Sequence, residues 1–328
     1  WINQGFLSLK DIEELVKLNK PIVWTMHDMW PCTGICHHAR DCEKFQMGCE
    51  SCFFLKSKGK DLSTSVFDKK LSLYKEANIT FVGCSRWLSG RAKKSYLLRD
   101  KTVLSIPNPI DTEVYHPMDQ DMTRELLGLP SGKRLLLFGA LNVTDKRKGI
   151  DYLIEALRKI EKQDVELVVF GQVKDDIRGL FPVPIHSMGY LSDESKIVAL
   201  YNAVDMFITS SLEENLPNTI MESMACGTPC VGFEIGGIPE MIDHKINGYV
   251  ASYKDASDLA NGIQWVLEQD QLALSDACVK KVQENYTEEV IVMKYLSLYQ
   301  NILYKNDGKL YIPKSYPNLY GSRRTDCI

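Results

Sequence analysis

The stretch "VDMFITSSLEENLPNTIMESMACGTPCVGFE", Val204–Glu234, contains one complete pattern of strand, loop, helix and strand. Its two ends are short apolar runs. Between them, "NTIMESMACG" reads as a helix that Asn218 caps at its start and that ends just before Gly227. The same succession of apolar runs and helical patterns continues from Arg134 onward. It predicts a parallel sheet covered by helices, which is the α/β class.

The part of the chain before Arg134 indicates a second sheet. "PIVWTMHD", "ITFVGCS" and "TVLSIPN" each read as a strand with helical sequence around it. Next, "IPNPIDTEVYHP", Ile106–Pro117, contains three prolines, which prevent regular pairing and mark a linker. The chain starts at Trp1 and passes almost directly into a helical pattern, so we expect a fragment that begins inside its first domain.

Composition excludes several classes of function. The 328 residues are 45% hydrophobic and 25% charged, and the net charge of -4 offers no electrostatic reason to expect a nucleic-acid partner. No run reaches the ~18 consecutive apolar residues of a membrane span, and no signal-peptide pattern is present. No strand is followed by G-x-G-x-x-G, which disfavours a dehydrogenase. We therefore expect a cytoplasmic protein.

Glu214 and Glu222 are separated by seven residues, and both follow the strand "VDMFITS". In open α/β sheets, ligands bind beyond the carboxyl ends of the strands, and the N–H groups at the start of the following helix favour a phosphate. One carboxylate can then hold a ribose and the other a reacting sugar, through their hydroxyl groups. The alternative is that both glutamates are ordinary solvated charges, and the spacing alone does not decide.

Three further motifs accompany this pair: a linker of the form P-N-x-x-D-T-x-x-Y-x-P, "DKRKG" after the strand "RLLLFGA", and "GGIPEMI" after "PCVGFE". In order and spacing they resemble the retaining glycosyltransferases of family 4, over the chain to about residue 300. The resemblance implies the GT-B fold, in which two Rossmann-like domains face a cleft. It divides the chain into the second half of the acceptor-side domain (1–108), the donor-binding domain (109–285), and a helix that crosses back to the first domain, plus a tail (286–328).

The resemblance also implies roles for individual residues. Glu222 matches the glutamate that binds the donor ribose, and Glu214 the one that contacts the transferred sugar. Lys148 matches the lysine that pairs with the diphosphate, and His27 the strand-end histidine that orients the donor sugar. The sequence departs from the family at Asn142, where many members have an arginine. Either Lys146 or Arg147 supplies the missing charge, or the leaving group relies on Lys148 and the helix terminus alone.

Further positions match residues that line the donor site. The loop Leu216, Pro217, Asn218 and Thr219 matches the one whose backbone approaches the sugar and the diphosphate, and Gly139, Ala140 and Gly171 match positions along the donor cleft. Tyr190 and Leu191 lie in "HSMGYLSDES", which resembles the segment that cups the nucleotide base. Glycines that follow strands are also common without any ligand.

The implied activity is transfer of a sugar from a nucleotide-diphosphate sugar to a glycan or lipid-linked acceptor, in the assembly of a surface polysaccharide or lipopolysaccharide. The family's chemistry needs no catalytic metal. A GT-B sugar-nucleotide epimerase and a non-catalytic nucleotide-sugar-binding module are the alternatives. Much of the acceptor side, and any peripheral membrane association, would belong to the half of the first domain that is missing here.

A cysteine cluster, "CTGICHHARDCEKFQMGCESC", follows the first strand and holds five of the ten cysteines. The most economical metal-ligand set is Cys36, Cys42, Cys49 and Cys52, which suits a tetrahedral structural zinc. An iron–sulfur cluster would use similar residues, and a loop without metal is the third interpretation. In each case we expect the loop to brace the region beside His27.

Overall fold

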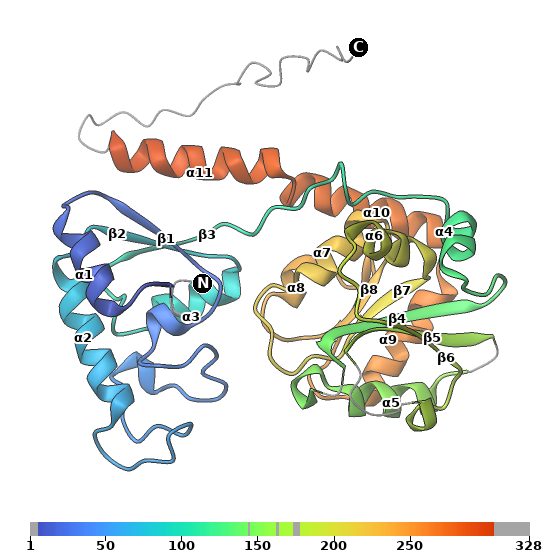
Figure 1. Cartoon of the computed structure of the whole chain (residues 1–328), viewed down its shortest axis with the longest axis horizontal. Helices are drawn as coiled ribbons and strands as arrows, with labels where there is room; N and C mark the ends of the chain where they lie inside the picture. Colours follow the sequence, from blue (N-terminus) through green and yellow to red (C-terminus); the bar gives the residue numbers. More distant parts are fainter. Residues whose placement is uncertain (1–5, 144, 162–163, 173–177, 305–328) are drawn as a thin grey trace.

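The computed structural model describes residues 6–143, 145–161, 164–172 and 178–304. It confirms the predicted α/β class, because the chain forms two separate parallel sheets, each with helices packed on it (Figure 1). The two sheets belong to two domains joined by the proline-containing linker. In the described part of the chain, no helix is both long enough and apolar enough to span a bilayer.

The first domain contains a small parallel sheet in the order β1-β2-β3. Its elements are β1 (Ile22–Met26), β2 (Ile79–Gly83), β3 (Thr102–Ser105), α1 (Leu9–Lys17), α2 (Leu62–Glu76) and α3 (Arg86–Lys93), with the short 3-10 turns η2 (Trp30–Cys32) and η3 (Lys44–Gln46) between β1 and α2. The aromatic rings of Trp24, Tyr74 and Phe81 pack together at the centre of this domain.

The second domain contains a six-stranded parallel sheet in the order β6-β5-β4-β7-β8-β9. Its strands are β4 (Arg134–Asn142), β5 (Val165–Gln172), β6 (Ile185–Gly189), β7 (Met206–Thr209), β8 (Cys230–Phe233) and β9 (Gly248–Ala251). The strand order reverses between β4 and β7, and such a switch point is where open α/β sheets form their ligand crevice. The fold therefore directs attention to the carboxyl ends of these two strands.

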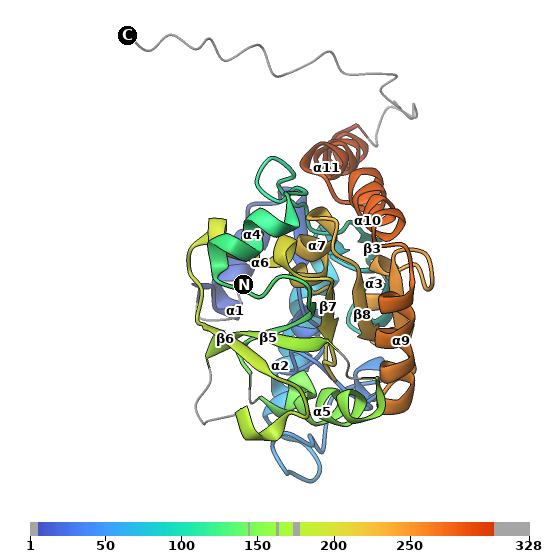
Figure 2. The same ribbon diagram turned by 90° about the vertical axis from the view of Figure 1, so that its right-hand side faces the viewer.

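Helices cover both faces of this sheet (Figure 2). They are α4 (Gln120–Leu127), α5 (Ile150–Lys159), α6 (Glu194–Ala203), α7 (Asn218–Ala225), α8 (Ile238–Met241), α9 (Ala256–Glu268) and α10 (Gln271–Asn285), with the 3-10 turns η4 (Lys146–Lys148) and η5 (Arg178–Leu180). The last helix, α11 (Glu288–Leu303), lies against the first domain, where the hydroxyl groups of Tyr295 and Thr25 are 2.8 Å apart.

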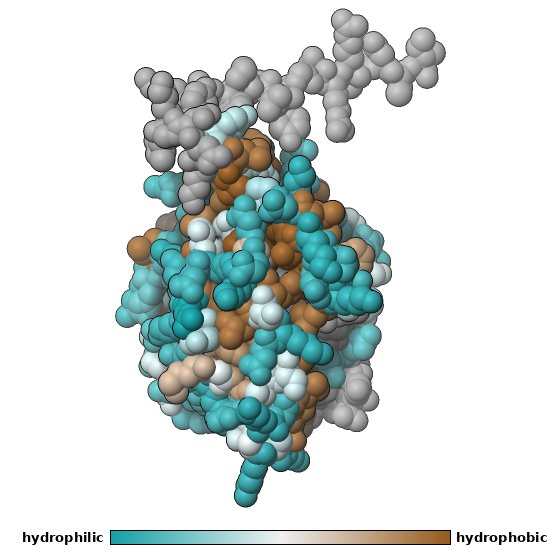
Figure 3. Space-filling view, turned by 90° about the vertical axis from the view of Figure 1, so that its left-hand side faces the viewer, coloured by the Kyte–Doolittle hydropathy of each residue, from teal (hydrophilic) through white to brown (hydrophobic). Residues whose placement is uncertain are grey.

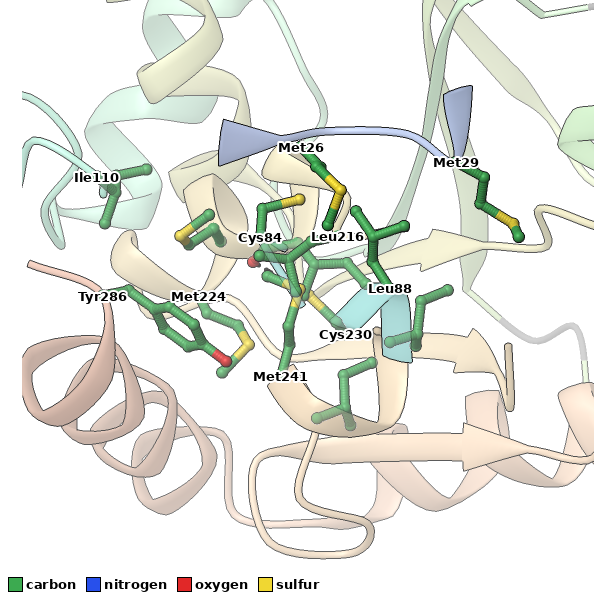
Figure 4. Packing of buried hydrophobic residues seen from close by; sticks show 14 of the residues in the cluster. Met26, Met29, Cys84, Leu88, Ile110, Leu216, Met224, Cys230, Met241 and Tyr286 are labelled. Carbon is green, nitrogen blue, oxygen red and sulfur yellow. Dashed lines mark hydrogen bonds between the residues drawn. The ribbon is translucent and has the colours of Figure 1, made fainter. Parts of the chain in front are cut away.

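One apolar core continues from the first domain into the second. Figure 4 shows Met26, Cys84 and Leu88 of the first domain close to Leu216 and Met241 of the second. Because all five side chains are buried, separating the domains would expose them to water. This packing sets how the ends of β1 and β2 face the second domain.

An apolar cavity of about 400 Å³ lies between α1 and the edge strand β1, and it reaches Met26 and His27 at the end of that strand. Figure 3, which views the first domain from its outer side, shows hydrophobic residues across the middle of this face. The cavity is lined mainly by aliphatic and aromatic side chains, with few polar groups. It lacks the convergent charges that the predicted chemistry requires.

Candidate active site

A cavity of about 810 Å³ lies between the two domains. The first domain contributes the ends of β1 and β2 and part of the cysteine-rich loop, and the linker contributes Asn108 and Pro109. The second domain contributes η4, which follows β4, and the loop 213–219, which follows β7. The cavity therefore lies at the switch point of the second sheet, and it brings together His27, Lys148, Glu214 and the loop Leu216–Thr219, as the sequence analysis expects.

Lys148 and Glu214 form an ion pair in this cavity. The Nζ atom of Lys148 donates to Oε1 of Glu214 at 2.6 Å, although the two residues are 66 positions apart in the sequence. The sequence analysis assigns one to the diphosphate and the other to the transferred sugar. Their contact places these two groups side by side in the cavity.

The turn that carries Lys148 is tied to the loop that carries Glu214. The hydroxyl of Ser210 donates to the carbonyl of Lys148 at 2.9 Å, and the N–H of Leu212 donates to the carbonyl of Arg147 at 2.7 Å. Gly149 ends the turn at φ 66°, and a Cβ there would lie 1.9 Å from the carbonyl oxygen of Ser210. Only glycine allows both the left-handed conformation and this close approach.

His27 reaches the donor loop through the linker. Its Nε2 lies 3.1 Å from Oδ1 of Asn108, whose amide group donates to Oδ1 of Asn218 at 3.2 Å. The predicted N-cap role of Asn218 is therefore wrong: α7 begins at Asn218 itself, Pro217 occupies the cap position, and no side chain caps the helix. The Asn218 side chain instead contacts the linker. Gly227 ends the helix at φ 80°, as predicted.

Asn215 is a site residue that the sequence analysis missed. Its amide nitrogen donates to the His27 carbonyl at 2.9 Å and to the Cys84 sulfur at 3.0 Å, and its Oδ1 accepts from the Ser85 hydroxyl at 2.5 Å. All three partners lie at the ends of β1 and β2 in the first domain. Asn215 directly follows Glu214, and its side chain therefore ties this loop to the opposite wall of the cavity.

The "GGIPE" motif packs against the loop that carries Glu214 and Asn215. A Cβ at Gly236 would lie 2.1 Å from the Glu214 carbonyl oxygen, and one at Gly237 would lie 2.4 Å from that of Asn215, so the motif needs glycines to pack on this loop. Its glutamate, Glu240, accepts the N–H groups of Arg86 and Trp87 at 2.8 and 2.7 Å. A carboxylate of the second domain thus caps helix α3 of the first.

Glu222 has different surroundings from Glu214. Among the described residues that line the interdomain cavity, Glu214 is present and Glu222 is not. Glu222 accepts a hydrogen bond from the Tyr201 hydroxyl at 2.9 Å, and burial raises its pKa, with Glu194 nearby acting in the same direction. The Tyr115 hydroxyl, from the linker, donates to Glu194 at 3.3 Å. The structure thus separates the two glutamates, as different roles would require.

The glycines predicted along the donor cleft have a packing reason of their own. A Cβ at Gly139 would lie 1.8 Å from the ring of Phe170, and one at Gly171 would lie 1.7 Å from the Ala140 carbonyl oxygen. These contacts join β4 to β5 without any ligand. Gly139, Ala140 and Gly171, like Tyr190 and Leu191, are not among the described residues that line the interdomain cavity.

The predicted metal ligands do not form a site in the structure. Among the described residues, no group of three or more His, Cys, Asp or Glu side chains is placed to hold a metal ion. Cys36 lies near Cys42, Cys49 and Cys52; burial first, and these neighbouring thiols next, raise its pKa to about 12. Zinc or iron–sulfur binding by these four cysteines stays a prediction from the sequence.

A buried lysine braces the cysteine-rich loop instead. The Nζ atom of Lys70, on α2, donates to the carbonyls of Trp30, Thr33 and Gly34 at 2.6, 3.0 and 3.0 Å. It also lies 3.4 Å from the centroid of the Trp30 ring. These bonds hold the chain that directly follows His27, so α2 braces the start of the cysteine-rich loop.

Comparison with known proteins agrees with this description. Residues 132–269 match the family model of glycosyl transferases group 1. N-acetyl-alpha-D-glucosaminyl L-malate synthase of Bacillus anthracis is 26% identical over 62% of this chain and 55% of its own length. The putative colanic acid biosynthesis glycosyl transferase WcaC of Escherichia coli is 22% identical over 92% of this chain and 75% of its own.

Solved structures show the same fold. The Anabaena protein HepE in complex with UDP matches 90% of this chain and 77% of its own at 17% identity, with a TM-score of 0.69. Sucrose-phosphate synthase from Thermosynechococcus elongatus matches 86% of this chain and 68% of its own at 20% identity, with a TM-score of 0.66.

Two parallel α/β domains with a charged cavity between them define a protein of the GT-B fold. Its second domain, over residues 132–269, matches the family model of the group 1 glycosyl transferases. This confirms the family that the motifs indicate. The chain spans about half the length of the curated relatives that it matches, at 55%, 53% and 43% of theirs.

Proposed function

We propose that this chain is the nucleotide-sugar-binding part of a retaining glycosyltransferase, which moves a sugar to a glycan or lipid-linked acceptor in surface polysaccharide or lipopolysaccharide assembly. The observation that carries the proposal is the Lys148–Glu214 pair, which faces His27 across one interdomain cavity. The relative WcaC is named for colanic acid biosynthesis, and a Campylobacter jejuni relative, 33% identical over 35% of this chain, is named for a diphospho-undecaprenol substrate.

Lys148 has the role of stabilising the leaving group. As the bond between the sugar and the diphosphate breaks, negative charge builds on the diphosphate. An ammonium group held at that place lowers the energy of the transition state more than that of the bound donor. The backbone of Lys148 is held by the η4 turn and by the Ser210 hydroxyl, and its ammonium group is held by Glu214. Arg147 of the same turn is already paired with Asp145 at 2.6 Å.

Glu214 and His27 have the role of holding the transferred sugar. Glu214 offers carboxylate oxygens to sugar hydroxyls from the second domain, and His27 approaches from the first. In front-face attack the leaving diphosphate itself takes the acceptor proton, so the mechanism requires no protein nucleophile. Glu222 would bind the ribose, at a distance from the reacting centre.

Epimerisation of a sugar nucleotide would use the same cavity. Its product is a free sugar or an isomerised sugar nucleotide, whereas transfer yields a new glycosidic bond on an acceptor. Analysis of the products formed by the full protein from a labelled donor distinguishes the two. A non-catalytic binding module would bind the donor and release it unchanged.

We expect a nucleoside diphosphate to bind this chain without a divalent ion. The cationic group of Lys148 and the start of α7 are available to the phosphates in place of a metal. Calorimetric titration with UDP, GDP and ADP in the presence of EDTA measures this directly. If binding appears only after magnesium or manganese is added, the metal-free donor site is wrong.

Replacing Glu222 by alanine should weaken binding of the bare nucleoside diphosphate about 10-fold or more. The ribose hydroxyls would lose a charged acceptor, and each such hydrogen bond is worth about 1.5–3 kcal/mol. Calorimetry with the preferred diphosphate measures the loss, and circular dichroism checks that the variant is folded.

Two control variants separate ribose binding from local packing. Tyr201→Phe removes the hydrogen bond that Glu222 accepts in the free protein and should change affinity by less than about 3-fold, because the carboxylate remains. Glu268→Ala alters an exposed glutamate at the end of α9 and should leave affinity unchanged. Equal losses in Glu222→Ala and Tyr201→Phe would mean that Glu222 only supports the fold.

A further inference from the structure

A short apolar segment protrudes between the cysteine-rich loop and α2. Phe53, Phe54 and Leu55 are consecutive and are 72%, 46% and 38% exposed, and the nearby Met47 is 84% exposed. The segment lies at the lower end of the first domain in Figures 1 and 2, beside the start of α2. Single exposed apolar residues are common on protein surfaces, whereas adjacent ones indicate contact with something apolar.

Basic residues surround this apolar tip. Lys56, Lys58 and Lys60 follow it directly, and all three are exposed. From residue 44 to residue 60 the chain has four lysines against a single acidic residue, Glu50, although the whole chain has a net charge of -4. The excess of positive charge is confined to the tip itself, because Glu43 and Asp61 flank this stretch.

The tip is held in one conformation by hydrogen bonds at its base. The carboxylate of Asp61 accepts from the Cys52 N–H at 2.8 Å and from the Ser57 hydroxyl. The Ser51 N–H donates to the Gly59 carbonyl at 2.8 Å. The rings of Phe53 and Phe54 also contact each other edge to face, with centroids 5.6 Å apart. The apolar side chains are thus exposed on a braced turn.

We propose that this tip, Phe53–Lys60, docks on the surface of a bilayer that contains anionic lipids. Phenylalanine and leucine side chains enter the boundary between headgroups and acyl chains, while adjacent lysines bind anionic headgroups. The charge of the tip favours a bilayer over an apolar protein groove. In a protein groove each of the three lysines beside the apolar residues would need its own acidic partner. A protein partner or a second copy of the chain is an alternative that the experiment below detects.

The tip is also close to the candidate active site. Phe54 lines a side cavity of about 240 Å³ together with Arg40, Arg147 and Glu213. Arg147 and Glu213 line the main interdomain cavity as well, so the side cavity adjoins it. A bilayer that binds the tip would therefore lie beside the mouth of the active site. This consequence rests on the proposed function. It favours a lipid-linked acceptor over a glycan in solution as the substrate of that function.

Vesicle co-sedimentation tests the docking in the absence of donor and acceptor. The protein should bind vesicles of phosphatidylcholine with phosphatidylglycerol, and added salt should weaken binding. Phe53→Ser with Leu55→Ser should reduce partitioning about 10-fold or more. Lys56→Gln, Lys58→Gln and Lys60→Gln together should reduce it about 100-fold on these vesicles and remove the salt dependence. Phe54 is left in place because it lines the side cavity.

A matched control changes two exposed apolar residues elsewhere. Met122 and Leu126, on α4, are 70% and 71% exposed, and replacing both by serine should not alter vesicle binding. The docking proposal is overturned if the tip variants bind vesicles as the unchanged protein does, or if no vesicle is bound. It is also overturned if light scattering shows self-association that the tip variants abolish while vesicles are ignored. If the full protein transfers sugar to a water-soluble acceptor and does not bind vesicles, the docking inference is wrong while the proposed function still holds.

Discussion

Replacing Glu214 by glutamine should lower turnover of the full protein about 100- to 1,000-fold, the range typical for removing one charged or polar group that acts on the transition state. Affinity for the bare nucleoside diphosphate should stay within about 3-fold of the unchanged protein, or become tighter. The reason is the 2.6 Å contact with Lys148: without the Glu214 carboxylate, the ammonium is fully available to the diphosphate. The preference for the sugar-bearing donor over the bare diphosphate should be lost.

Calorimetry with diphosphate and with donor sugar, together with single-turnover rates, measures these separate effects. Glu268→Gln, at an exposed position on α9, is the matched control for the loss of one negative charge. If Glu214→Gln weakens the binding of every ligand by the same small factor, the carboxylate is an ordinary surface charge and the proposed site is wrong.

Replacing Lys148 by methionine should have an effect of similar size on turnover, about 100- to 1,000-fold, because the leaving diphosphate would lose the cation that meets its developing charge. Unlike the Glu214 variant, it should also weaken the binding of the bare diphosphate about 10-fold or more. The reason is that the ammonium already pairs with a phosphate in the bound state. Stopped-flow turnover and calorimetry distinguish this pattern from that of Glu214→Gln.

The neighbouring lysine is the sharpest control for this assignment. Lys146 lies in the same η4 turn and is exposed, so Lys146→Met removes an identical charge two residues away. This substitution should lower turnover and diphosphate affinity by less than about 3-fold. Lys148→Arg keeps the charge with a different geometry and should recover only part of the rate. Equal losses from Lys146→Met and Lys148→Met would show that the turn contributes only its general positive charge, in place of the arginine that the family has at Asn142.

The class of fold and the main residues of the site could be predicted from the sequence. Apolar runs of strand length separated by helical patterns require buried strands between helices, and this requirement is local enough to read along the chain. Gly227 ends α7 as predicted, because the left-handed conformation after a helix selects glycine. The motif around Glu214 and the lysine of "RKG" could be located because each belongs to a continuous segment that resembles a family motif.

The polar partners of these residues were decided by the tertiary structure. Lys148 meets Glu214, Asn215 binds the ends of β1 and β2, and Glu240 caps a helix of the other domain more than 150 residues away. Asn218 looked like a helix cap, but its side-chain Oδ1 accepts from the Asn108 amide group instead.

The same distinction applies to the cysteines. Their spacing suits a metal and the fold places Cys36 near Cys42, Cys49 and Cys52, but no group of three or more among the described residues is placed to hold a metal ion. A sequence records which residues must be buried and how the backbone turns, since these depend on near neighbours. Which hydrogen-bonding groups meet depends on how the two domains pack through the shared apolar core around Met26, Leu216 and Met241, and this packing exists only in the folded chain.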